Sequence, residues 1–321
     1  MKPILKLTFA ALAMAVACNA TAQSWPAKPV RLILSQAAGT SPDISARFIA
    51  ERLGRLWGQT LVVENRAGGQ NVIGAQAAAR SAPDGYTFFY ATTAAIVTNP
   101  FTFKALPYDP PRDFDAVAMI AKSPMVVAVG ANVPAKTLAE LVALDKSRPN
   151  TLSSAHEGPR TFSGMMSAAL NQATGMQALQ VPYNGATPAI QDTIGGRTQI
   201  VFLSSAAVTP FIKRGDLRPI AVTVGKRVSG LEGVPALAET YPGFDYSGWF
   251  ALLAPAGTPK DVILRVNRDV NQVLGEPEVA QRLRDLGLLL EPGPPEALNE
   301  FLALERIRWS KLVKDIGLQP E

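Results

Sequence analysis

Short apolar runs rich in β-branched residues alternate with stretches of helical periodicity along most of this chain. Strands are expected at residues 29–35, 60–65, 86–92, 151–155, 177–183, 198–205, 217–224 and 248–256. Helices are expected at residues 42–58, 71–82, 137–147, 161–175, 187–196, 209–215, 259–275 and 295–317. This alternation predicts an α/β fold with two mainly parallel sheets and flanking helices.

The alternation falls into two blocks, which extended runs join near Ser123 and Val222. A chain of 321 residues with 47% apolar residues is large enough for two domains of ordinary size. A chain that passes from one lobe into another and returns leaves a cleft between them. We therefore expect one lobe to combine residues 23–124 with 223–321, including the C-terminal helices, and a second lobe to comprise residues 125–222.

The first 22 residues have the form of a secretory signal peptide. They contain two lysines, an apolar core from Leu7 to Ala17, and Ala20-Thr21-Ala22 as a cleavage signal. We expect cleavage after Ala22. The alternative is lipid attachment at Cys18, because "AVAC" partly resembles a lipoprotein signal. If Cys18 is removed, the mature chain has no cysteine, which excludes a disulfide, a thiol nucleophile and a thiolate metal site.

Charge and motifs exclude several other functions. The net charge is +5, and the basic residues are scattered, which gives no support for nucleic-acid binding. His156 is the only histidine, so a histidine-based metal cluster is excluded, and no G-x-S-x-G motif is present. The glycine-rich "GGQNVIG" at residues 68–74 lacks the lysine of a phosphate loop. The sequence therefore predicts no cofactor and no metal.

Two loops lie where ligands bind in α/β sheets, at the carboxyl ends of expected strands. In "LSQAAGTSPD", Ser41 is expected to be the N-cap, Pro42 the first helical residue, and Asp43 a partner of the helix dipole. The second loop is "TLSSAHEGPRTF" at residues 151–162. The backbone amides of such a turn can hold an anion. From the residues alone, the first loop is better explained as a joint between a strand and a helix that binds nothing, because such joints are common.

Eight motifs occur in the order in which one protein family has them: "WPAKPVRLIL", "AAGTSPDISAR", "LVVENRAGG", "APDGYTFFY", "LPYDPPRDFDAV", "VPYNGATPAIQDTIGGRTQIVF", "IKRGDLRPIAVT" and "GWFALLAPAGTP". From Trp25 to the C-terminus the chain resembles the extracytoplasmic solute-binding receptors of the tripartite tricarboxylate transporter group, the Bug family. The resemblance implies a two-lobed periplasmic-binding-protein fold (type II) that closes around a small organic acid. It also implies a periplasmic monomer that delivers the acid to a membrane permease and catalyses nothing.

Two other functions stay open at this point. A protein of the same fold could present its closed form to a signalling partner. A secreted hydrolase could use a serine with His156, although the sequence has no motif for one.

The resemblance, together with the strand ends, predicts the ligand contacts. They are Gln36, Ala38, Gly39, Thr40, Ser41, Thr92, Thr93, His156, Arg160, Thr161, Tyr183, Leu203 and Ser204. Asp43 is expected to cap its helix rather than touch the ligand. Tyr183, Phe162 and Trp249 are candidates for an apolar wall.

Three departures from the family pattern refine the ligand class. Leu203 stands where the family often has an aspartate, so a partner for an amino group is missing. Ser163 falls where the family has a histidine, and Arg160 adds a guanidinium that suits a carboxylate. These departures favour carboxylates without an amino group. For Arg160, the alternative to a ligand contact is an ion pair with Glu157. For His156, the alternative is an exposed position in the loop.

Overall fold

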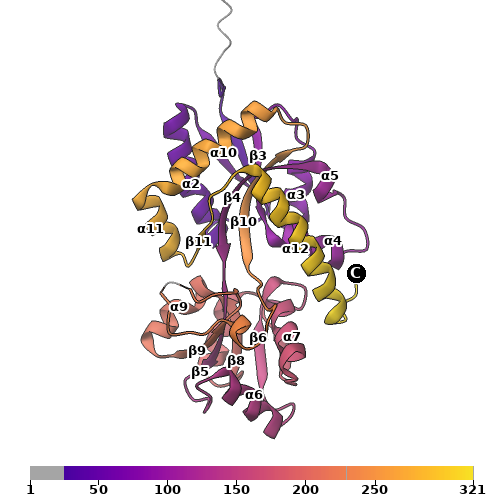
Figure 1. Ribbon diagram of the computed structural model, residues 1–321, viewed down its shortest axis with the longest axis vertical. Helices are drawn as coiled ribbons and strands as arrows, with labels where there is room; N and C mark the ends of the chain where they lie inside the picture. Colours follow the sequence, from indigo (N-terminus) through magenta and orange to yellow (C-terminus); the bar gives the residue numbers. More distant parts are fainter. Residues whose placement is uncertain (1–24, 229, 321) are drawn as a thin grey trace, which may run out of the picture.

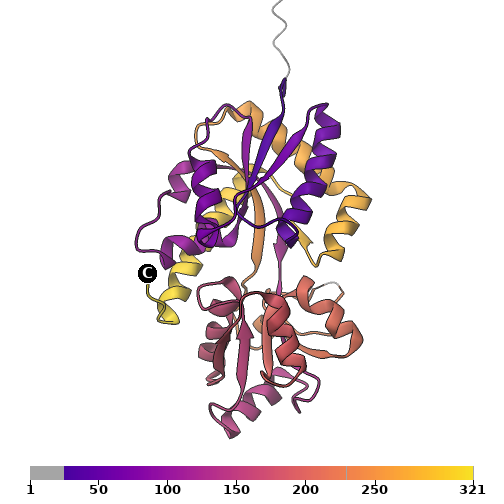
Figure 2. The same cartoon turned by 180° about the vertical axis from the view of Figure 1, so that it is seen from behind.

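A computed structural model describes residues 25–228 and 230–320. The predicted signal peptide, including Cys18, lies outside these residues. The described chain forms two halves, each built on its own sheet and stacked along the long axis of the molecule (Figure 1). The view from behind shows the same two halves, with strands running between them (Figure 2).

The first sheet has six strands in the order β11-β4-β10-β3-β1-β2. Their bounds are β1 Val30–Leu34, β2 Leu61–Asn65, β3 Thr87–Thr92, β4 Phe114–Ser123, β10 Gly248–Pro255 and β11 Leu289–Leu290. The central strands are continuous apolar runs because helices cover both faces of the sheet. Phe250 and Leu252 face one layer of core side chains, and Ala251 and Leu253 face the other.

Helices of both chain ends cover this sheet. On one face lie α2 (Ser41–Trp57), α10 (Lys260–Gly275) and α11 (Pro277–Asp285). On the other face lie α3 (Val72–Ala79) and α12 (Pro295–Asp315). Short helical segments complete this half, namely Gly69–Asn71, Ala94–Thr98, α4 Asn99–Thr102 and α5 Pro110–Asp113. Helix α11 and strand β11 were not predicted, and both lie between the two expected C-terminal helices.

The second sheet has five strands in the order β7-β6-β8-β5-β9. Their bounds are β5 Met125–Gly130, β6 Ser153–His156, β7 Leu179–Pro182, β8 Ile200–Ser204 and β9 Leu217–Val222. Core side chains of α6 (Leu138–Ser147) and α7 (Phe162–Thr174) pack on one face. Those of α8 (Ala186–Ile194) and α9 (Ser205–Arg214) pack on the other.

The two sheets with flanking helices are as expected, but both sheets are mixed, which corrects the expectation that they are mainly parallel. In the first sheet β1 pairs in parallel with β2 and β3, whereas β10 runs antiparallel to β3 and β4. In the second, β6 is parallel to β7 and β8, whereas β5 is antiparallel to β8 and β9. Strands β10 and β5 begin where the chain crosses between the two halves, and their direction follows from that crossing. Strand β11 also runs antiparallel to β4 but does not follow a crossing.

The strand directions bring two sets of loops face to face. Strand β4 ends at Ser123, and the chain enters β5 through Pro124, so the carboxyl end of β4 points toward the second half. Strands β1, β2 and β3 run in the same direction as β4, because β10 is antiparallel to both β3 and β4. By the same reasoning β6, β7 and β8 point back toward the first half. The loops that follow β1, β2 and β3 therefore face the loops that follow β6, β7 and β8 between the two halves.

The segment after β9 packs with the second half before the chain returns. The side chains of Val224, Val228, Val234 and Ala236 belong to the same core layer as β5 and β8. A backbone bridge joins Val222 to Ala236. The chain then reaches the first sheet at Gly248, where β10 begins.

Helix α12 packs on the first sheet and reaches the second half with its final turns (Figure 1). The Trp309 ring lies 5.3 Å from the ring of Phe162, the first residue of α7. Glu305 is 3% exposed and accepts hydrogen bonds from the indole nitrogens of Trp249 and Trp309. Within residues 25–228 and 230–320, no helix combines the length and apolar character that crossing a bilayer requires.

Candidate ligand-binding site

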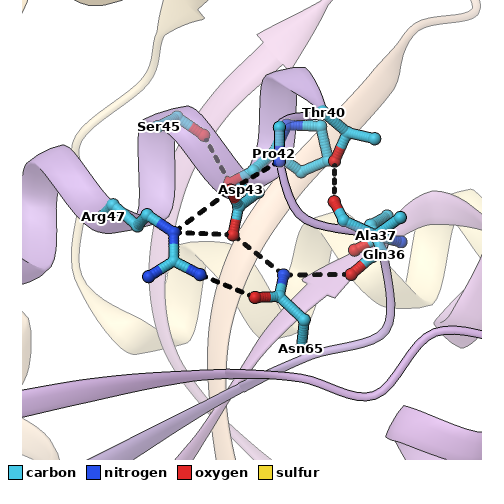
Figure 3. A network of polar contacts seen from close by, with 9 residues as sticks. Gln36, Ala37, Thr40, Pro42, Asp43, Ser45, Arg47 and Asn65 are labelled. Atoms are coloured by element: carbon cyan, nitrogen blue, oxygen red, sulfur yellow. Dashed lines mark hydrogen bonds and ion pairs between the residues drawn. The ribbon is translucent and has the colours of Figure 1, made fainter.

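The loop after β1 is held in place by a network around Asp43 (Figure 3). The Asp43 carboxylate accepts hydrogen bonds from the Gly39 amide at 2.9 Å and from Arg47 Nε at 3.0 Å. Asn65, the last residue of β2, donates from Nδ2 to Asp43 Oδ1 at 2.8 Å. Burial acts to raise the Asp43 pKa, but these three donors outweigh burial and hold the pKa below its usual value. Asp43 is therefore a buried carboxylate that organises the loop.

The helix that follows this loop begins one residue earlier than expected. Thr40, not Ser41, occupies the N-cap position, and Ser41 and Pro42 are the first helical residues. Thr40 makes no capping bond to the helix; its hydroxyl donates to the Ala37 carbonyl at 2.7 Å. Asp43 bonds the Gly39 amide, just before the N-cap, so it caps the loop rather than the first turn of the helix.

The exposed part of the loop, residues 37–40, offers backbone groups to a ligand. Ala38, Gly39 and Thr40 lie there as expected. The amides of Ser41 and Asp43 donate to no group among residues 25–228 and 230–320. First-turn amides of this kind, at the positive end of a helix dipole, suit a carboxylate.

Gln36 and Thr92 form a second polar cluster beside the loop. Gln36 Nε2 donates to Asn71 Oδ1 at 2.6 Å and to Thr92 Oγ1 at 3.2 Å. The structure therefore brings Gln36 and Thr92 together, as the strand ends predicted. Thr93 has a different task, since its hydroxyl accepts the Trp249 amide at 2.8 Å where β10 begins.

In the second half, the loop after β6 is folded on itself. Gly158 donates its amide to His156 Nδ1 at 3.0 Å, and the Glu157 amide donates to Ser163 Oγ at 3.0 Å. Thr161 is the N-cap of α7 and accepts the Gly164 amide at 3.2 Å. A threonine directly before a helix is typical of this capping role.

His156 is not an exposed loop residue, which corrects one alternative. It is the last residue of β6 and only 1% exposed, and burial lowers its pKa. Because Nδ1 accepts the Gly158 amide, the neutral ring carries its proton on Nε2. Nε2 has no hydrogen-bond partner among the described residues. His156 is therefore a neutral hydrogen-bond donor below the first turn of α7.

Arg160 forms a hydrogen bond with the C-terminal segment. The ion pair with Glu157, which was the alternative for Arg160, does not form within the described part of the chain. The Nη2 atom of Arg160 donates to the backbone oxygen of Gln319, which follows α12, at 3.2 Å. Arg160 thus connects the second-half loop to the C-terminal segment. The expected contact of Arg160 with a ligand carboxylate stays a prediction.

The other residues that were expected to contact a ligand from the second half differ in burial and in hydrogen bonding. The Tyr183 hydroxyl donates to Asp192 Oδ2 at 2.9 Å, and Ser204 is the N-cap position of α9. Leu203 is 1% exposed and packs in the core of the second half. Strand alternation turns the Leu203 side chain toward the α8 and α9 layer, and its expected contact with a ligand stays a prediction. Trp249 is likewise 1% exposed and is a core residue rather than a site wall.

Two residues that hold the loop of the first half were not among the predicted site residues. Asn65 and Asn71 act on this loop from other elements, and no local pattern marks them. Ser163, which the sequence marks only as a departure from the family pattern, holds the loop after β6. Asn71 has a positive φ of 78°, and the neighbouring Gln70 has 52°, which places the Asn71 amide against Gln36. No cluster of three potential metal ligands occurs in the described part of the chain.

Two helix-covered mixed sheets, joined by crossing strands and with ligand-type loops at facing strand ends, define the periplasmic-binding-protein class. The chain belongs to the family described as "Tripartite tricarboxylate transporter family receptor", whose model matches residues 45–318. Members of this family are extracytoplasmic solute-binding proteins rather than enzymes.

Individual relatives agree with this assignment. The chain is 31% identical to "Protein BugT" of Bordetella pertussis over 304 residues, which covers 94% of this chain and 93% of that protein. The solved structure "R. palustris Rpa4515 with adipate" has a TM-score of 0.82 and 32% identity, covering 92% of this chain and 100% of that one. "MatC (Rpa3494) from Rhodopseudomonas palustris with bound malate" has a TM-score of 0.75 and 27% identity, covering 90% and 100%.

Replacing Asp43 by asparagine is expected to reduce the free energy of unfolding by about 1–2 kcal/mol at neutral pH, because charged hydrogen bonds are lost and Arg47 is half exposed. The folded-state pKa of Asp43 is lowered, so its contribution is present above the unfolded pKa of about 3.9 and is lost as pH falls through the folded value. Urea unfolding at several pH values tests this prediction. The difference between wild type and variant should shrink in acid, and a constant difference would contradict it. Glu51→Gln, on the exposed side of α2, is the control.

Proposed function

We propose that this protein is a periplasmic receptor that captures a small carboxylate-bearing solute between its two halves and delivers it to a membrane permease. The first lobe comprises β1–β4, β10, β11 and their helices, and the second lobe comprises β5–β9 and their helices. The packing of residues 224–236 supports a return to the first lobe near Gly248, later than the Val222 boundary expected from sequence.

One observation carries the proposal. Loops at the carboxyl ends of strands from both lobes face each other, and the loop of the first lobe presents the Ser41 and Asp43 amides at the start of a 17-residue helix. A carboxylate satisfies these donors and the helix dipole together. Adipate in Rpa4515 and malate in MatC, both organic acids bound by structures of the same fold, support this ligand class.

Binding is expected to close the two lobes, because a ligand that contacts both loops stabilises the arrangement in which they are near each other. Thr161, His156, Tyr183 and Ser204 are the proposed contacts from the second lobe. The neutral Nε2–H of His156 supports recognition of an acceptor oxygen, once the loop above it moves. No group in this set can balance the charge of a ligand ammonium, which favours acids without an amino group.

Thermal unfolding against a panel of acids tests the proposed function. The panel includes adipate, malate, succinate, benzoate and glutamate, added to protein that has been unfolded and refolded to remove copurified ligand. An acid at about a hundred times its Kd stabilises by ~2.7 kcal/mol and raises the midpoint by a few degrees. A shift with adipate or malate but not with glutamate is expected. If no acid of the panel raises the midpoint, the proposed ligand class is wrong.

A further inference from the structure

The side-chain amide of Asn65 holds both ends of the loop in the first lobe. Its Nδ2 atom donates to the Gln36 carbonyl at 3.0 Å and to Asp43 Oδ1 at 2.8 Å. One nitrogen thus holds two positions on opposite sides of the exposed residues 37–40, as Figure 3 shows. Both of its hydrogens are used.

The orientation of this amide is fixed by a third contact. Arg47 Nη2 donates to Asn65 Oδ1 at 2.7 Å, while Arg47 Nε bonds Asp43. The amide nitrogen faces two acceptors and the amide oxygen faces a donor, so the reversed orientation would place like groups together. Asn65 is therefore set by Arg47 before it acts on the loop.

The position of Asn65 follows from the first sheet. Strands β1 and β2 are parallel, and Leu34 at the end of β1 is in register with Asn65 at the end of β2. The Arg66 amide donates to the Leu34 carbonyl at 2.7 Å, so the backbone beside Asn65 is tied to the point where the loop begins. A rigid sheet edge thus carries the group that shapes an exposed loop.

We infer that Asn65 is a positioning residue for the ligand: it sets the loop conformation in which the Ser41 and Asp43 amides converge on a carboxylate. This inference rests on the proposed function, because it assigns Asn65 its role through the loop that binds the ligand. Asn65 itself donates both hydrogens to the loop and none to the ligand.

The test replaces Asn65 by aspartate, which has the same shape but no hydrogen to donate when ionised. The change removes two hydrogen bonds and places a second carboxylate beside Asp43. The Kd for adipate and for malate is expected to rise by about tenfold or more at about pH 8, measured by calorimetry. In ligand-free protein, amide hydrogen exchange in a peptide covering residues 35–44 should be faster than in wild type.

The pH dependence separates positioning from a general loss of stability. Two adjacent carboxylates share a proton as the pH falls, and in the N65D variant the shared proton restores one hydrogen bond between the introduced carboxyl group and Asp43. The ratio of variant Kd to wild-type Kd should therefore decrease toward about pH 5, whereas ligand protonation cancels in the ratio. Asn65→Ala, which adds no carboxylate, should bind weakly with a pH-independent ratio, and it keeps the test usable if N65D does not fold.

Asn171→Asp is the matched control in the second lobe, because Asn171 Nδ2 also donates to a backbone carbonyl, that of Ala178, at 2.8 Å. It should leave Kd and the exchange of residues 35–44 unchanged. Wild-type Kd and exchange in both Asn65 variants would overturn the inference. If wild-type protein binds neither acid, the ligand class fails, while the exchange data still decide whether Asn65 sets the loop.

Discussion

Replacing Gly164 by alanine is expected to destabilise the second lobe by about 3 kcal/mol and to abolish ligand capture. A Cβ atom at this position would lie 2.0 Å from the Gly158 oxygen and 2.9 Å from the Pro159 Cα. Both obstacles are backbone atoms, so no side-chain rotation relieves the clash. The loop from His156 to Thr161 would have to leave the first turn of α7, and the Thr161 cap with it.

Urea unfolding and calorimetry with adipate measure the two effects of Gly164→Ala. Gly275→Ala, at the end of α10, is the control, because its Cβ would meet nothing within 4 Å. The control should be as stable as wild type and should bind as well. A Gly164→Ala protein with wild-type stability would show that the loop does not pack on α7 as described.

Replacing Glu305 by leucine is expected to reduce the free energy of unfolding by about 3–4 kcal/mol. The carboxylate accepts from Trp249 Nε1 at 3.2 Å, from Trp309 Nε1 at 3.0 Å and from Arg308 Nη1 at 3.0 Å. Both tryptophans are buried, so leucine leaves two indole N–H groups without an acceptor. Urea unfolding measures the loss, and Glu300→Gln on the exposed side of α12 is the control.

The pH dependence of Glu305→Gln sharpens this prediction. Burial raises the Glu305 pKa, although the two indoles and Arg308 act in the opposite direction. An acid with a raised folded-state pKa favours folding most below its unfolded pKa of about 4.3, and this contribution decreases as pH rises toward the folded value. The wild type should therefore exceed Glu305→Gln in stability by more in acid than at neutral pH. A difference that grows with pH would contradict the assignment.

Much of the fold could be predicted because its signals are local. Alternating apolar runs and helical patterns identified the strands and most helices, and the alternation located the two blocks. Strand direction could not be obtained in this way, because strands covered on both faces have the same apolar pattern whether they run parallel or antiparallel. The direction of β10 depends on its return from the second half of the molecule, which no residue in 248–255 encodes.

The site was predictable to the extent that it depends on neighbours in sequence. Thr161 as a cap, and the loop that opens α2, follow from capping residues. The facing of Leu203 could not be predicted, because Ile200 to Leu203 are all buried and neither face of β8 is marked by polar residues. Asn65 escaped notice because its partner Asp43 lies 22 residues away, and Glu305 because its partner Trp249 lies 56 residues away. Only the folded chain brings these groups together.

The central place of β10 determines the order in which a growing chain can form its two sheets. All strands of the second sheet lie within residues 125–222, so that sheet has every strand once this segment has been made. The first sheet has a gap between β3 and β4 until residues 248–255 emerge, and Trp309 comes later still. During synthesis, residues 30–123 therefore lack the central strand of their sheet at a stage when residues 125–222, although made later, already contain every strand of the second sheet. In truncated chains of increasing length, residues 125–222 should therefore become protected from amide hydrogen exchange before residues 30–123 do.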